Sequence, residues 1–152
     1  MSKVLVLLSL CCFMGTSGFA NVSSLWQEPE SKYKVGQQWS YHSRPGEEES
    51  YFVVLKIDHD AKLGNIVHIA MKRLRMKNRR SPDGISENVN HMPFSEEAIN
   101  KSQPKLLKEK VELPSFEEGY QMWREAFDKG HAGIYTISIA EAVGVMESTL
   151  GQ

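Results

Sequence analysis

The early part of the chain alternates apolar and polar side chains with a period of two, which is typical of β-strands. The segment "QQWSYHS" places Trp39 and Tyr41 on one side of a short strand. Pro45 and Gly46 in "RPGEEE" then supply turn chemistry. The pattern therefore predicts a first strand that ends in a turn near residue 46.

Two longer alternating segments follow, "SYFVVLKIDHD" and "NIVHIAMKRLRMK", joined by the turn "AKLG". A single hairpin register aligns their apolar residues: Ile57 with Val67, Leu55 with Ile69, and Val53 with Met71. Together with the first strand, they predict an antiparallel three-stranded meander. After Met71 the apolar positions shift by one, to Leu74 and Met76, which predicts a β-bulge near Lys72 and Arg73.

The later part of the chain has a period near 3.6. Residues 81–90 are polar and predict a loop, and "PFSEEAIN" predicts a helix with Ser95 as N-cap and Phe94 packed on Ile99. Pro104 should end or kink that helix, after which "KLLKEK" resumes it.

The segment "PSFEEGYQMWREAFDKG" predicts a further helix, with Ser115 and Glu118 as a capping box and Gly130 as its stop. Its apolar stripe consists of Phe116, Tyr120, Trp123 and Phe127. The short "GIYTI" predicts a fourth strand, and Ser138 with Glu141 predicts another capping box. The last helix carries Ile139, Val143, Met146 and Leu150 on one face.

This order of elements predicts an α+β fold: an antiparallel meander sheet of three to four strands with about three helices packed on one face. Residues 1–20 have the pattern of a cleaved signal peptide, with Lys3, a short apolar run, and small residues at Gly18 and Ala20. Residues 21–152 then form a single domain without cysteine, because Cys11 and Cys12 are removed with the peptide. We expect a periplasmic or secreted protein without a stable membrane anchor.

The charge balance argues against a nucleic-acid partner. Removal of Lys3 leaves 17 Lys and Arg against 19 Asp and Glu, a net charge of about −2. Nevertheless, "MKRLRMKNRR" at 71–80 contains six basic residues. In a meander this run lies beside Glu47, Glu48 and Glu49, so one interpretation is a solvated rim whose charges compensate each other.

The second interpretation is a contact surface for an anionic partner. The candidate residues are Arg73, Arg75, Lys77, Arg79 and Arg80. Export favours an acidic protein surface, a polyanionic glycan or a phosphate-bearing envelope lipid as that partner.

The sequence contains few signals of a metal site, a catalytic site or a ligand pocket. The histidines at 42, 59, 68, 91 and 131 lack the spacing of a helical zinc motif, so neither a metal nor a cofactor is predicted. No nucleophile motif is present and no catalytic residue is assigned. The aromatic residues could line a ligand pocket between helix and sheet, although core packing is the commoner role of such a stripe. That pocket would contain Trp39, Tyr41, Tyr120 and Trp123.

The segments "YKVGQQWSYHSRPGEEES", "HMPFSEEAINKS" and "LPSFEEGYQMWREAFDKGHAGIYTISIAEAV" resemble an uncharacterised family of small exported bacterial proteins. The resemblance implies a bacterial source and export. It implies no activity, cofactor or site.

These observations favour a non-catalytic exported protein that binds a partner, most plausibly another protein; an immunity or inhibitor role is one concrete form. Two alternatives remain open. The first is an envelope-acting hydrolase that uses carboxylate or His residues such as Asp58 or His59. The second is a small-ligand-binding protein with a pocket between the aromatic helix and the sheet.

Overall fold

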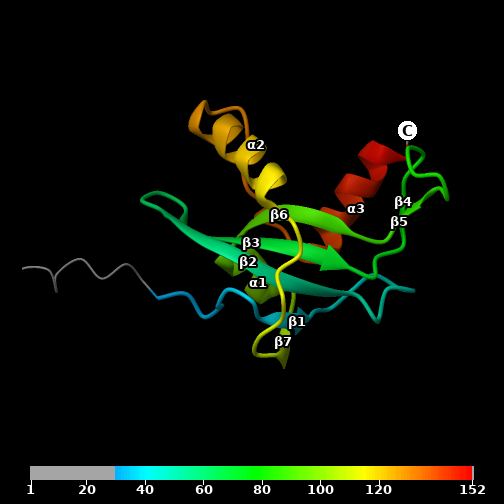
Figure 1. Cartoon of the computed structure of the whole chain (residues 1–152), viewed down its shortest axis with the longest axis horizontal. Helices are drawn as coiled ribbons and strands as arrows, with labels where there is room; N and C mark the ends of the chain where they lie inside the picture. Colours follow the sequence, from blue (N-terminus) through cyan, green and yellow to red (C-terminus); the bar gives the residue numbers. More distant parts are fainter. Residues whose placement is uncertain (1–29, 152) are drawn as a thin grey trace, which may run out of the picture.

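The computed structural model describes residues 30–151 as an α+β fold, as the sequence predicts. An antiparallel five-stranded sheet has the order β6-β3-β2-β1-β7, and β4 and β5 form a separate two-stranded sheet (Figure 1). The strands are β1 (Gln38–Ser40), β2 (Tyr51–Asp60), β3 (Gly64–Lys72), β4 (Met76–Lys77), β5 (Ile85–Ser86), β6 (Val89–Ser95) and β7 (Lys105–Lys108). The helices are α1 (Glu96–Lys101), α2 (Glu117–Asp128) and α3 (Ile139–Leu150).

The predicted signal peptide lies outside the described residues. Within residues 30–151, no helix combines the length and the apolar character needed to cross a bilayer.

The β2–β3 hairpin is the centre of the sheet. Its turn is fixed by the Asp60 carboxylate, which accepts hydrogen bonds from the backbone N–H groups of Lys62 and Leu63 at 2.8 and 2.9 Å. Gly64 adopts a φ of 71°, a conformation that glycine reaches without steric cost. The predicted pairing of Ile57 with Val67 is confirmed.

Beyond Ile57 the predicted register is wrong by one residue. A bulge at Leu55 shifts β2, so that Val54 pairs with Ile69 and Phe52 pairs with Met71. The physical reason is that residues 52–55 are apolar and buried on both faces, so alternation does not choose between the two phases. The bulge places the large ring of Phe52 in the main core.

The shift of the apolar positions after Met71 is present, but a turn and not the predicted bulge produces it. β3 ends at Lys72, Arg73 takes a positive φ of 57°, and the chain then enters β4. This turn keeps both Leu74 and Met76 buried in the core.

Three segments of the later chain differ from the prediction. The segment predicted as a loop, 81–90, contains β5 and the start of β6, an edge strand that tolerates Pro93 because edge strands do not need every N–H. "KLLKEK" does not resume a helix: Gln103 has a positive φ of 52°, and residues 105–108 form β7, paired with β1. The predicted fourth strand "GIYTI" is reduced to one parallel bridge between Tyr135 and Phe94.

The helix caps are partly as predicted. Ser95 caps α1, and Ser138 with Glu141 forms a capping box at α3. The predicted capping box of Ser115 and Glu118 is wrong, because α2 begins at Glu117 after Phe116, which has no side-chain cap. Gly130 ends α2 with a φ of 72°, as predicted.

The helices do not share one face of the sheet, which corrects the predicted arrangement. α1 and α3 contribute Ala98, Ile99, Ile139, Ala142 and Val143 to the main core, together with Val67 and Ile69 of β3. α2 instead packs on the opposite face, where the Trp123 ring lies 4.8 Å from that of His68. His68 lies between Val67 and Ile69 in β3, and alternate side chains of a strand point to opposite faces.

Candidate functional site

The basic residues predicted as a binding surface are all exposed. We call the side chains of Arg73, Arg75, Lys77, Arg79 and Arg80 the basic surface. Leu74 and Met76 between them are buried, so alternation along this segment turns Arg73, Arg75 and Lys77 outward. Figure 1 shows β4 beside the C-terminal end of α3.

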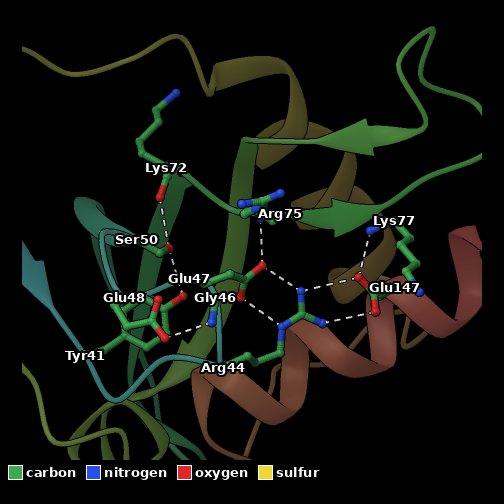
Figure 2. A network of polar contacts seen from close by, with 10 residues as sticks. All are labelled: Tyr41, Arg44, Gly46, Glu47, Glu48, Ser50, Lys72, Arg75, Lys77 and Glu147. Atoms are coloured by element: carbon green, nitrogen blue, oxygen red, sulfur yellow. Dashed lines mark hydrogen bonds and ion pairs between the residues drawn. The ribbon is translucent and has the colours of Figure 1, made fainter.

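A buried carboxylate fixes the backbone behind the basic surface. Glu47 is 3% exposed and accepts two hydrogen bonds from the Arg44 guanidinium, at 2.6 and 2.8 Å. It also accepts one from the backbone N–H of Arg75 at 2.8 Å (Figure 2). Burial acts to raise the pKa of Glu47, but these hydrogen bonds outweigh it and lower the pKa, so the carboxylate is ionised at neutral pH.

Glu147 of α3 extends the same network. Its carboxylate accepts a hydrogen bond from the backbone N–H of Lys77 at 2.7 Å and lies 3.4 Å from Arg44 (Figure 2). Hydrogen bonding to Glu47 is the main cause of a raised pKa at Arg44. The β1–β2 turn, β4 and α3 are thereby joined around one guanidinium.

The predicted closeness of the Glu47–Glu49 turn to the basic run is confirmed, whereas one pair within residues 30–151 compensates charge between them. Arg73 lies 3.2 Å from Glu49. Glu47 and Glu147 are engaged by Arg44 and by backbone N–H groups. Within residues 30–151, the side chains of the other four members of the basic surface have no acidic partner within 4.0 Å: Arg75, Lys77, Arg79 and Arg80.

The four aromatic residues predicted to line one pocket are not brought together. Trp39 and Tyr41 are buried in the main core, where Tyr41 hydrogen-bonds Ser50 at 2.9 Å and burial raises its pKa to about 12. Tyr120 and Trp123 lie on the opposite face, against His68. The sheet itself separates the two pairs.

A histidine network on that opposite face was missed by sequence reasoning. His68 is fully buried, and its Nδ1 lies 2.9 Å from Nε2 of His91. Its Nε2 lies 3.2 Å from Oδ2 of Asp58, which also accepts a hydrogen bond from the Tyr120 hydroxyl at 2.8 Å. His59, which the sequence places beside Asp58, is instead exposed at the hairpin end and contacts Asn65.

The protonation of this network follows from its surroundings. Burial lowers the pKa of His68 to about 4 and also lowers the pKa of His91, so both rings are neutral at pH 7. Burial acts to raise the pKa of Asp58, but the Tyr120 hydrogen bond and nearby Lys56 contribute to a net lowering. An ionised carboxylate thus faces two neutral imidazoles.

Gly119 allows α2 to approach β6 at this point. A Cβ atom at position 119 would lie 3.1 Å from Cβ of His91, closer than about nine in ten such contacts, so one of the two residues would have to shift. The signal that could have located the site is this glycine, which is unfavourable in a helix interior unless close packing requires it. Among residues 30–151, no three His, Cys, Asp or Glu side chains are arranged to hold a metal ion.

Comparison of the chain with family models, curated proteins and solved structures found no match.

Proposed function

We propose that the chain is an exported, non-catalytic binding protein whose basic surface docks on an acidic region of a partner protein. The observation that carries this proposal is the lack of an acidic partner for the side chains of Arg75, Lys77, Arg79 and Arg80 within the described residues.

The rigidity of the surface supports the proposal. Glu47 and Glu147 hold the backbone N–H groups of Arg75 and Lys77, so β4 is fixed before any partner arrives. Binding then requires ordering of side chains only, which costs less conformational entropy than ordering the backbone as well. A preorganised strand with outward cations is a suitable docking element.

The charge distribution supports a local electrostatic contact. The chain is close to neutral overall, with 18 Lys and Arg against 19 Asp and Glu, so the attraction would be confined to one surface. Such a patch increases the association rate and orients the partner more than it raises affinity. Domains with a general affinity for nucleic acid are typically basic overall, whereas this chain has a slight acidic excess.

The first experiment is affinity capture of tagged residues 21–152 from envelope extract. The variant carries Glu at positions 75, 77, 79 and 80; Arg73 is left unchanged because it pairs with Glu49. The matched control carries Glu at Lys62, Lys105, Lys108 and Lys129, which are exposed and lie elsewhere. Both variants change the net charge equally, so only the location of the charge differs.

We expect a defined protein to be enriched by the native chain and the control, and lost with the basic-surface variant. Binding of that partner should also weaken as salt is raised, because exposed charges are screened. Retention of the same partner by the basic-surface variant would contradict the proposal. So would binding to heparin or anionic vesicles with no binding to polyglutamate or to any protein.

A further inference from the structure

A cavity of about 420 Å³ lies between β6 and the first half of α2, within the size range of small-molecule sites. Its apolar lining comes from Val89, Phe116 and Met122, and residue Met122 is 68% exposed. Its polar lining comes from Asn90, Ser115, Glu118 and His91. Apolar surface and hydrogen-bonding groups therefore meet in one place.

The network behind the cavity determines which nitrogen of His91 is an acceptor. The ionised Asp58 carboxylate can only accept, so neutral His68 carries its hydrogen on Nε2, which faces the Asp58 carboxylate at 3.2 Å. Nδ1 of His68 then accepts the hydrogen of His91 Nε2 across 2.9 Å. The remaining nitrogen of His91, Nδ1, is left with a lone pair.

That lone pair lies on the cavity side of the ring. His91 Nε2 points toward the buried His68, whereas Nδ1 is the ring nitrogen nearest to Gly119, at 4.0 Å from the position of a Cβ there. Both His91 and Gly119 line the cavity. A bound group that donates a hydrogen bond is therefore favoured beside His91.

The charge of the cavity lining favours a cationic donor over an anionic one. Glu118 is the charged residue of its lining, and it is exposed at the rim. A cation gains from Glu118 and donates to the neutral His91, whereas an anion meets a carboxylate and an acceptor nitrogen. Phe116 and Met122 add apolar contact for a hydrocarbon body.

We propose that this cavity binds a primary amine with an apolar body, its ammonium held between Glu118 and Nδ1 of His91. The Asp58–His68–His91 network acts as the positioning element, since it fixes the tautomer that accepts from the ligand. This site is separate from the basic surface and does not depend on the proposed docking function.

The site predicts that amine affinity falls in acid. Protonation of His91 removes the lone pair and places a second cation beside the ammonium. The groups that face this network come from three sides: Lys56 and Asp58 on β2, His68 on β3, and Tyr120, Trp123 and Arg124 on α2. Asp58 favours protonation of His91, but burial has the larger effect and lowers its pKa, so the affinity should hold at neutral pH and fall in acid as His91 becomes protonated.

The test uses 2-phenylethylamine as probe, with 2-phenylethanol and phenylacetate as uncharged and anionic analogues. Binding is followed by the His91 imidazole signals in NMR titrations of the whole mature chain. We expect millimolar or tighter binding of the amine, weaker binding of the alcohol, and none of phenylacetate. Glu118→Gln should weaken the amine about two- to fivefold, the range for an exposed ion pair, whereas Glu125→Gln on the same helix should not.

Several results would overturn the proposal. They are equal affinities for amine and alcohol, equal effects of the two glutamine variants, or absence of any shift at His91 when the amine is added. Because His91 also packs against Gly119, its role is measured in the unmodified protein through the pH dependence of amine affinity. An affinity that does not change across the pH range in which the His91 NMR signals themselves titrate would count against a role for His91.

Discussion

At the scale of single residues, Gly119 shows how one missing methyl group positions a helix. A glycine in a helix interior costs about 1 kcal/mol relative to alanine, so Gly119→Ala, in the first turn of α2, should gain at most that amount from propensity. The added Cβ would meet His91 at 3.1 Å, and overpacking costs about 1–3 kcal/mol. We expect a net destabilisation on the order of 1 kcal/mol, measured by urea denaturation.

The control for this prediction is Gly144→Ala in α3. A Cβ at position 144 would meet no atom within 4 Å, so only propensity applies, and we expect stabilisation by up to about 1 kcal/mol. If both substitutions stabilise the protein equally, α2 is free to move away from β6 and the close contact is not important.

Glu47 is the residue on which the network behind the basic surface depends. Glu47→Gln leaves the Arg44 guanidinium beside an uncharged amide and weakens the bond from the Arg75 backbone. We expect a loss of about 2–3 kcal/mol in the free energy of unfolding, because one partner of a mostly buried ion pair is removed. Thermal or chemical denaturation measures this loss.

Glu49→Gln is the matched change at an exposed pair. Glu49 and Arg73 are 83% and 65% exposed, so solvent screens their attraction and the expected effect is below about 0.5 kcal/mol. Similar losses for the two variants would show that burial of Glu47 gives its contacts no additional strength.

At the scale of elements, α2 is joined to the sheet through His68, and this makes the packing sensitive to acid. The pKa of His68 is about 4 in the folded state against an ordinary 6.5, so the folded chain binds fewer protons than the unfolded chain between these values. Stability should therefore fall as pH drops from 6.5 to 4, by at most about 1.4 kcal/mol per pH unit for this residue. Equilibrium denaturation across this range measures the slope.

His68→Gln should flatten that slope, and His59→Gln, at the exposed hairpin end, should leave it unchanged. Burial also lowers the pKa of His91, so a smaller slope in the same direction remains in the His68 variant. A slope as steep in the His68 variant as in the native protein would show that other groups control the acid response. The lowered pKa values of Glu47 and Asp58 add to the same fall at the acid end of this range and below it, where these carboxylates take up protons in the unfolded chain.

The elements also show what the sequence could predict. The hairpin turn, the α1 cap and the α3 capping box were predictable because each depends on residues within four positions of one another. The bulge at Leu55 was not, since an apolar run on both faces fits either register. β7 was read as helix because "KLLK" has no strong strand preference, and it becomes a strand only through pairing with β1.

Of the two candidate sites, one could be located from the sequence and the other could not. The basic surface was predictable because it is contiguous in sequence. The histidine network was not, because its members come from β2, β3, β6 and α2, and β6 itself was hidden by Pro93 and its polar neighbours. Trp39 and Trp123 were assigned to one layer because periodicity does not say which face of a sheet a helix covers.

At the scale of the whole molecule, the exposed edge of the sheet is the feature that most favours aggregation. Within residues 30–151, β7 has no strand on its outer side, and Leu106 and Leu107 are 39% and 52% exposed. Lys105 and Lys108 flank them, and edge lysines oppose pairing between molecules. Lys105→Ala with Lys108→Ala should increase light scattering at high protein concentration.

The same two substitutions at Lys62 and Lys129 change the net charge equally but lie away from this edge. We expect them to leave scattering near that of the native protein. Equal aggregation of the two double variants would assign the effect to net charge and not to the edge strand.

The strand order also determines the sequence in which the strands pair during folding. The β2–β3 hairpin closes through a tight turn, whereas β1 pairs with β7 across 65 residues of chain. Closing a long loop is slow because its entropy must be lost before contacts are gained. Folding should therefore start at the hairpin and finish at β7, and in hydrogen exchange the amides of β2 and β3 should be the last to exchange.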